Sequence, residues 1–323
     1  MEYIGDVPRL VQVGRFWLQA RPGLPDAYQY NYSHLSLVFQ DYSKDTIILT
    51  RAMTRAFLDQ PRAAFPTGNG RLMISSYSMA MRYSIVSDIH GNLEAFEAVL
   101  HDPAFSAADR IVCLGDIVGY GANPQECIDL LHDHDVICIA GNHDWAAAKQ
   151  LDTAMFNAPA RHALTWTADH LDAEHQRFLA NLPLTWEEEF FMISHASPGT
   201  PDQWNYIVTR FDALWNFSTF RQPLCFVGHT HIPMIFTLNE TGDVDERRLP
   251  RTVSLQGRSK WIINVGSVGQ PRDHNPAAAY GILDTKNKVF RLRRVTYDVK
   301  RAQIKILAAG LPLILAERIE SGW

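Results

Sequence analysis

Five short polar segments in the sequence each bring a potential metal ligand directly after an apolar run. Each contains a carboxylate, an amide or an imidazole beside small residues. Divalent ions such as Mn, Fe, Zn and Ni accept this mixture of oxygen and nitrogen ligands. The segments are Asp88-Ile89-His90, Gly115-Asp116 with the following residues to 121, Gly141-Asn142-His143-Asp144, Ser194-His195-Ala196 and Gly228-His229-Thr230-His231.

Two of these segments carry ligands two residues apart, namely Asp88 with His90 and His229 with His231. In extended backbone, side chains at this spacing project to the same side. Each pair can therefore hold one ion or straddle two adjacent ions, and the spacing leaves both arrangements open. Flanking glycines permit the sharp turns that converging strands require.

A single motif of this kind carries little weight. Gly-Asn-His-Asp also suits an ordinary turn, and Gly-His-Thr-His also suits an exposed loop. Seven other histidines have no partner motif and are expected to be solvated or structural: His34, His101, His132, His134, His162, His170 and His175. All five segments in order, each at an expected strand end, favour one shared metal site.

The elements that must position these residues begin as a strand-loop-helix pattern that repeats three times. Apolar runs at 83–87, 110–114 and 136–140 predict strands. Residues 93–100 show helical spacing, and Asn123, Pro124 and Glu126 predict the capped start of a second helix. This alternation favours an α/β sheet with parallel strands, in which ligands bind outside the carboxyl ends.

The rest of the chain reads mainly as strands, at 190–194, 224–227, 233–238, 261–265, 280–284 and 289–295. Two helices are expected between 159 and 182, and two closing helices at 299–309 and 313–319. The charged stretch 239–251, with Gly242, is expected to be a solvated hairpin loop.

In this order and with these residues, the five segments resemble the calcineurin-like metallophosphoesterase superfamily. The resemblance covers residues 83 to about 320. Segments 264–273 and 308–312 place it closest to the small bacterial phosphoesterases related to diadenosine tetraphosphate hydrolases. It implies an α/β fold, a four-layer αββα sandwich with two central mixed sheets.

The resemblance also implies a role for each candidate residue. A first divalent ion would be held by Asp88, His90, Asp116 and His231. Asp116 would bridge to a second ion, completed by Asn142, His195 and His229. Manganese is the first candidate, with Fe, Zn or Ni as alternatives. His143 would stabilise the phosphate or protonate the leaving oxygen, with Asp144 orienting its ring.

Such a pair of ions generates a bridging hydroxide that attacks phosphorus in line. Arg272, in a Gly/Pro-rich loop, is a candidate phosphate clamp because guanidinium matches phosphate oxygens bidentately. Protein Ser/Thr phosphatases of this superfamily carry Asp-Arg-Gly in the second motif, where this chain has Val118-Gly119-Tyr120-Gly121. We therefore expect a metal-dependent phosphohydrolase acting on a small phosphate ester or nucleotide.

Bulk composition sets further limits. The net charge of −5 gives no support to non-specific binding of nucleic acid or anionic membrane. The N-terminus lacks a secretory signal, and the apolar stretch 307–316 is too short to span a bilayer. Four cysteines without metal-finger spacing are expected to be reduced core thiols, so a cytoplasmic protein is expected.

Two alternatives stay open at this stage. One is a nuclease of the same superfamily, which the lack of a basic stripe disfavours. The other is a non-catalytic metal-binding scaffold, which the complete ligand set disfavours. The oligomeric state is not indicated.

Residues 1–80 contain no chemical motif, and one helix is expected near residues 45–58. They are interpreted as an N-terminal extension, either an accessory module or the product of an upstream start. Residues 81–323 are interpreted as the metallophosphoesterase domain.

Overall fold

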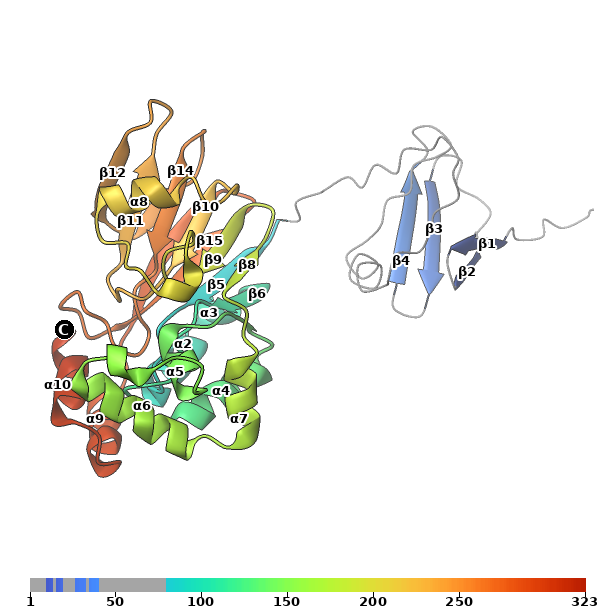
Figure 1. The fold of residues 1–323 in the computed structure, drawn as a ribbon. Helices are drawn as coiled ribbons and strands as arrows, with labels where there is room; N and C mark the ends of the chain where they lie inside the picture. Colours follow the sequence, from blue (N-terminus) through green and yellow to red (C-terminus); the bar gives the residue numbers. More distant parts are fainter. Residues whose placement is uncertain (1–9, 14–15, 20–26, 33–34, 41–79) are drawn as a thin grey trace, which may run out of the picture. The chain divides into compact units, whose positions relative to one another are not determined.

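The computed structural model describes residues 80–323 throughout, and before them only the strands at 10–13, 16–19, 27–32 and 35–40 (Figure 1). The chain divides into two compact units, Met1–Met79 and Ala80–Trp323. In the first unit, β1 (Leu10–Val13) pairs antiparallel with β2 (Phe16–Gln19), and β3 (Ala27–Tyr32) pairs with β4 (Leu35–Gln40). The helix expected near 45–58 lies outside the described residues.

The second unit contains two six-stranded mixed sheets. In the first sheet, β5 (Arg82–Val86), β6 (Arg110–Cys113) and β7 (Ile137–Cys138) are parallel, as predicted. The strands β15 (Ala278–Asp284), β16 (Val289–Val295) and β13 (Thr252–Ser254) extend it in antiparallel fashion. The carboxyl ends of β5, β6 and β7 therefore meet at one edge, each followed by a polar segment.

The second sheet repeats this arrangement. Its centre is parallel, with β10 (Leu224–Val227) between β9 (Phe191–Ser194) and β14 (Lys260–Asn264). The strands β8 (Thr185–Glu187), β11 (Met234–Leu238) and β12 (Val244–Arg248) complete it in antiparallel fashion. The histidine segments follow β9 and β10, so the second sheet delivers ligands from the same kind of strand end.

The two sheets pack face to face over an apolar core that includes Ile85, Leu114, Phe226, Ile263 and Phe290. Burial of such side chains is the main favourable contribution to folding. Helices cover the other face of the first sheet (Figure 1). They are α2 (Leu93–Leu100), α3 (Pro103–Ser106), α4 (Pro124–Asp133), α5 (Asn142–Ala147), α6 (Ala158–His170) and α7 (Ala173–Ala180).

Three more helices complete the layers. Against the outer face of the second sheet lies α8 (Arg210–Asn216), through residues such as Ala213 packed with Met192 and Phe236. Near the end of the chain, α9 (Val299–Ala308) and α10 (Leu313–Ser321) pack together. The predicted four-layer αββα sandwich is confirmed. Within the described part of the chain, no helix has the length and apolar character needed to cross a membrane.

Several local predictions were wrong. The strand expected at 136–140 is only β7, because the Ala140 N–H donates to the carbonyl of Pro183 and the chain leaves the sheet. The expected loop 239–251 contains β12, an edge strand that is mostly exposed and so shows no apolar alternation. Asn123 is the N-cap residue of α4 and Pro124 its first residue, as predicted, but the side chain of Asn123 donates to Glu126 Oε1 instead of making a capping bond to the backbone.

Candidate metal centre

The predicted ligands after β5, β6 and β10 lie in tight left-handed turns. The φ angles are 53° at Asp88, 52° at His90, 53° at Asp116, 65° at His229 and 61° at His231. The expectation of extended backbone at these pairs was therefore wrong. Non-glycine residues rarely adopt positive φ, and when they do they are concentrated at functional sites.

The turns are held together by backbone hydrogen bonds. The N–H of Asp88 donates to the carbonyl of Gly115 at 3.0 Å, and the N–H of His90 donates to the carbonyl of Asp116 at 3.0 Å. Gly141 allows close approach here, since a Cβ at this position would lie 2.1 Å from Asp116 Oδ1. Neighbouring turns thus brace one another around the carboxylates.

Four buried side chains form the first ligand group, with candidate ligand atoms within 4.8 Å of one another: Asp88, His90, Asp116 and His231. His231 Nε2 lies 3.2 Å from Asp88 Oδ1 and 3.1 Å from His90 Nε2. His90 Nε2 lies 3.7 Å from Asp116 Oδ2. These atoms surround one point, as ligands of one ion would.

The second ligand group consists of Asp116, His195 and His229 and is equally buried. His195 Nε2 lies 3.3 Å from Asp116 Oδ2 and 3.1 Å from His229 Nδ1. Asp116 belongs to both groups. Asp88 and His90 lie together in the first group, whereas His231 belongs to the first group and His229 to the second.

Hydrogen bonds on the far side of the rings set which nitrogen faces each group. The Nδ1–H of His90 donates to Val118 O at 3.0 Å, that of His195 to Leu114 O at 2.8 Å, and that of His231 to Gln270 O at 2.6 Å. Each ring therefore turns its Nε2 inward, toward the ligand groups. Metal-binding histidines are commonly oriented by such a carbonyl.

The electrostatics of the groups favour a cation. Burial lowers the pKa of His195, but Asp116 outweighs burial and raises it to about 9. Burial lowers the pKa of His229 to about 3 and holds that of His90 well below its ordinary value. Asp116 stays ionised despite burial, because His195 and its neighbours hold its pKa well below the usual range. The carboxylates thus attract positive charge to atoms where a metal would replace a proton.

Two observations test whether these residues fit metal ions. Oδ1 of Asn142 is buried without a hydrogen-bond partner. In addition, the Nε2 atoms of His90 and His231 face each other at 3.1 Å, although both Nδ1 atoms already donate elsewhere. Facing lone pairs and an orphaned oxygen are costly in a dry site unless a cation accepts them. The donor set therefore fits two divalent ions, and these buried clusters indicate a dinuclear metal site.

His143 lies beside the two groups on α5. Its ring centroid is 4.8 Å from that of His90, and burial lowers its pKa to about 4. Its Nδ1 is buried without a partner, and a Cβ on Gly119 would come within 2.4 Å of this atom. Gly119 is therefore needed to make room for the ring.

Asp144 does not orient the His143 ring, contrary to expectation. Its Oδ1 accepts from the backbone N–H groups of Ile117 and Val118, at 2.9 and 3.2 Å. Its Oδ2 accepts from the N–H of Gly141 at 2.9 Å. The pKa of Asp144 is raised to about 7 by burial and by Asp116. Asp144 thus braces the backbone around Asp116 and Asn142.

Arg272 faces the same site. Its guanidinium donates through Nη2 to Gln270 Oε1 at 2.9 Å and to the Tyr120 hydroxyl at 3.4 Å. Tyr120, only 7% exposed, lies 4.5 Å from the His143 ring between centroids. Neither partner of Arg272 is charged, so its positive charge stays available to an anion.

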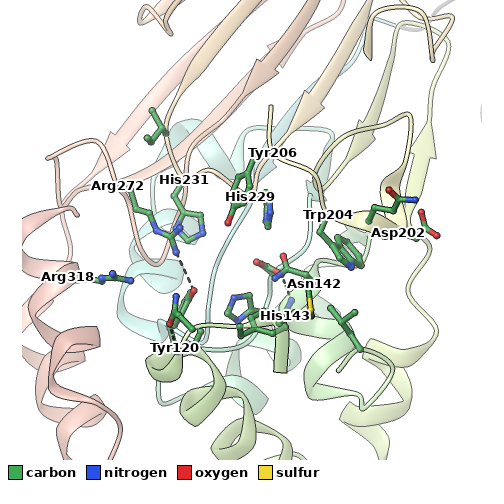
Figure 2. A pocket seen from close by; sticks show the side chains of 18 of the residues that line it. Tyr120, Asn142, His143, Asp202, Trp204, Tyr206, His229, His231, Arg272 and Arg318 are labelled. Atoms are coloured by element: carbon green, nitrogen blue, oxygen red, sulfur yellow. Dashed lines mark hydrogen bonds between the residues drawn. The ribbon is translucent and has the colours of Figure 1, made fainter. Parts of the chain in front are cut away.

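A pocket of about 750 Å³ opens beside these residues, and Asn142, His143, His229, His231 and Arg272 all line it (Figure 2). This volume falls within the range of small-molecule sites, roughly 300–1,000 Å³. The pocket also contains residues that sequence reasoning missed: Phe156, Asp202, Trp204, Tyr206, Arg318 and Trp323.

Among the missed residues, Tyr206 stacks on the His229 ring at 4.1 Å between centroids. Trp204 packs edge-on against Trp145 at 5.3 Å and near His195 at 6.0 Å. Two aromatic residues in a polar loop, nine and eleven positions after His195, were a signal that could have found this wall.

Comparison with known proteins agrees with the fold. The chain belongs to the calcineurin-like phosphoesterase superfamily, whose domain profile matches residues 81–288. It is therefore a metallophosphoesterase-family protein with a buried His/Asp metal-binding cluster.

Three relatives illustrate this membership. An uncharacterised protein of Methanocaldococcus jannaschii is 40% identical over 244 residues, 74% of this chain and 97% of its own length. The crystal structure of a metallophosphoesterase from Sphaerobacter thermophilus is 40% identical with a TM-score of 0.68, covering 76% of this chain and 100% of that one. The phosphodiesterase YfcE of Escherichia coli is 26% identical over 215 residues, 63% of this chain and 88% of its own length.

Proposed function

We propose that this protein hydrolyses a small phosphate ester or nucleotide with the aid of two divalent metal ions. The observation that carries the proposal is the sharing of Asp116 Oδ2 between two buried ligand groups at the wall of an open pocket. Manganese is the first candidate, and Fe, Zn or Ni suit the same donors.

The first ion would be held by Asp88, His90, Asp116 and His231, and the second by Asp116, Asn142, His195 and His229. When bound, such ions neutralise phosphate oxygens and lower the pKa of the water they bind to near neutrality. The two carboxylates offset part of the metal charge, and the neutral ligands leave the rest to attract an anionic ester.

The remaining residues would act on the ester itself. His143, at the pocket wall, would stabilise developing charge or give a proton to the leaving oxygen. Arg272 would bind a non-bridging phosphate oxygen, because its present partners are neutral. Asp144 would contribute indirectly, by holding the turn that carries Asp116.

The pocket favours a small substrate over a polymer. Its volume of about 750 Å³ suits a nucleotide, and Trp204 and Tyr206 offer rings on which a base can stack. Dinucleoside polyphosphates and phosphodiesters belong to this class. The activity in the name of YfcE gives reason to test diesters first.

The test is hydrolysis of bis-p-nitrophenyl phosphate, p-nitrophenyl phosphate and diadenosine tetraphosphate by wild-type protein and two ligand variants. Asp88→Asn and His195→Ala should abolish turnover while circular dichroism and thermal unfolding show folded protein. Arg177→Ala is the control, because Arg177 is exposed on α7. Full activity in both ligand variants would overturn the proposal, and the preferred substrate ranks diesterase, monoesterase and dinucleotide hydrolase.

A further inference from the structure

Arg318 is a cation at the pocket wall without an anionic partner among residues 80–323. It lies on α10 and lines the pocket, yet within residues 80–323 no hydrogen bond or ion pair involves its guanidinium. Its Nε is buried and unpartnered, and its Cζ lies 5.3 Å from the centre of the Trp323 ring. Burying an unpaired guanidinium N–H is unfavourable unless a ligand accepts from it.

Two arginines of β16 are paired differently. Arg293 donates to Asp102 Oδ2 at 2.8 Å, and Arg294 forms an ion pair with Asp273. These two guanidiniums have structural partners within the protein. In the part of the chain from residue 80 onward, the guanidinium of Arg318 contacts the Trp323 ring, which positions a guanidinium while leaving its N–H groups available.

The end of α10 is fixed to the loop that carries Arg272. The N–H of His274, two residues after Arg272, donates to the carbonyl of Gly322 at 2.7 Å. Gly322 has φ of 66°, and a Cβ there would lie 2.6 Å from Asn275 N, so the contact is close. The N–H of Gly322 donates in turn to Arg318 O at 2.9 Å. These bonds tie Arg318 and Arg272 into one wall.

The pocket is therefore polarised. Arg318, Arg272 and Tyr120 lie toward one end, whereas Trp204 and Asp202 lie toward the other (Figure 2). The backbone N–H of Arg272 donates to the carbonyl of His231 at 3.2 Å, which holds the Arg272 segment against the first ligand group. Arg318 is left to bind an anionic group beyond the phosphate that reacts.

We propose that Arg318, with a contribution from Arg272, binds a second phosphate of the substrate. The substrate class is then a phosphoester that carries at least one further phosphate, such as a nucleoside diphosphate or a polyphosphate-linked nucleotide. This inference rests on the proposed function, because the reacting phosphate lies at the ligand groups. It makes Arg318 a specificity-determining residue for that reaction.

The test compares two ligands that differ by one phosphorus group, AMP and adenosine 5′-(α,β-methylene)diphosphate. Isothermal titration calorimetry is done on the full chain with manganese in large excess over ligand, and chromatography checks that AMP stays intact. Wild-type protein should bind the diphosphate analogue about tenfold or more tightly than AMP. Arg318→Gln should bring this ratio to about two or less, with AMP affinity changed by less than about twofold.

Two further variants sharpen the result. Arg318→Lys should keep part of the preference, because it retains charge but not the planar fork. Arg177→Ala removes the same charge from an exposed position on α7 and should keep the full ratio. Thermal unfolding checks that each variant is folded.

An unchanged ratio in Arg318→Gln, equal affinity for the two ligands in wild-type protein, or no binding of either ligand would overturn the inference. Because binding requires no turnover, its failure is distinct from that of the proposed function. Loss of the preference in Arg318→Gln together with no hydrolysis of any ester would refute the activity alone.

Discussion

The backbone N–H of His143 donates to Oδ1 of Asp116 at 2.8 Å, which fixes the carboxylate that belongs to both ligand groups. The other oxygen, Oδ2, is thereby directed at His195 Nε2, 3.3 Å away. The first turn of α5 thus positions Asp116 with a backbone group and presents Asn142 and His143 to the same pocket. One short helix thus positions three of the residues proposed to act in hydrolysis, namely Asp116, Asn142 and His143.

The shared position of Asp116 predicts that its charge matters to both ions. Asp116→Asn keeps an oxygen for the His143 N–H but removes the carboxylate, so we expect less than one manganese ion per chain after dialysis. Asp88→Asn should lose mainly the first ion. Plasma emission spectroscopy measures the metal content. The sharing would be refuted by Asp116→Asn retaining two ions.

His143 is predicted to act on the leaving group. His143→Ala should lower kcat about 10²–10⁴-fold for phenyl phosphate esters, whose leaving oxygen needs a proton. For p-nitrophenyl esters, which leave readily, the loss should be smaller. Steady-state kinetics on both esters, with metal content as control, decide the matter. Equal losses on the two esters would assign His143 to charge stabilisation instead.

Arg272 is predicted to contribute mainly to substrate binding. Arg272→Ala should raise KM about 10–100-fold, because a charge-assisted hydrogen bond to phosphate is lost. Arg272→Lys should recover only part of this loss, since it lacks the bidentate fork. An Arg272→Ala protein with wild-type KM for every ester would contradict the clamp.

The contact of His175 on α7 with Asp129 on α4 is predicted to contribute to stability in a pH-dependent way. Burial lowers its pKa, but hydrogen bonding to Asp129 and interaction with Asp172 outweigh burial and raise the pKa above the ordinary value. Its Nε2 lies 3.1 Å from Asp129 Oδ1, and its Nδ1 lies 2.8 Å from Asp172 Oδ1 without hydrogen-bond geometry. A raised pKa stabilises the fold below about pH 6.5, and this stabilisation is lost as pH rises through the folded value.

The comparison is between wild type and His175→Gln in thermal unfolding at about pH 6 and about pH 9. The wild-type advantage should be present at the lower pH and absent at the higher one. It should be less than about 1 kcal/mol, because both carboxylates are largely exposed. An advantage that grows with pH would contradict the sign.

The parts of the fold that sequence predicted are those with strong periodicity. The parallel strands and their polar ends could be predicted because β5, β6, β9 and β10 consist mainly of apolar, buried residues. The edge strand β12 was missed since four of its five residues are charged and exposed, so it shows no alternation in hydrophobicity. The helix α5 was missed because its first residues were read only as a motif.

For the site, six of the seven proposed ligands belong to the two buried groups. The seventh, Asn142, lines the pocket beside them. The pocket wall was harder to predict. Arg318 and Trp323 lie about 50 residues from Arg272 in the chain, and the bond of His274 to Gly322 joins their two segments. Such a long-range contact leaves no local pattern in a single sequence.

The most direct test of the central claim is the rate of bis-p-nitrophenyl phosphate hydrolysis as manganese is added stepwise to metal-stripped protein. The account predicts almost no turnover without metal and a rate that reaches its plateau at about two equivalents per chain. Turnover that is complete without metal, or that plateaus at one equivalent, would contradict a catalytic centre built on the shared carboxylate of Asp116.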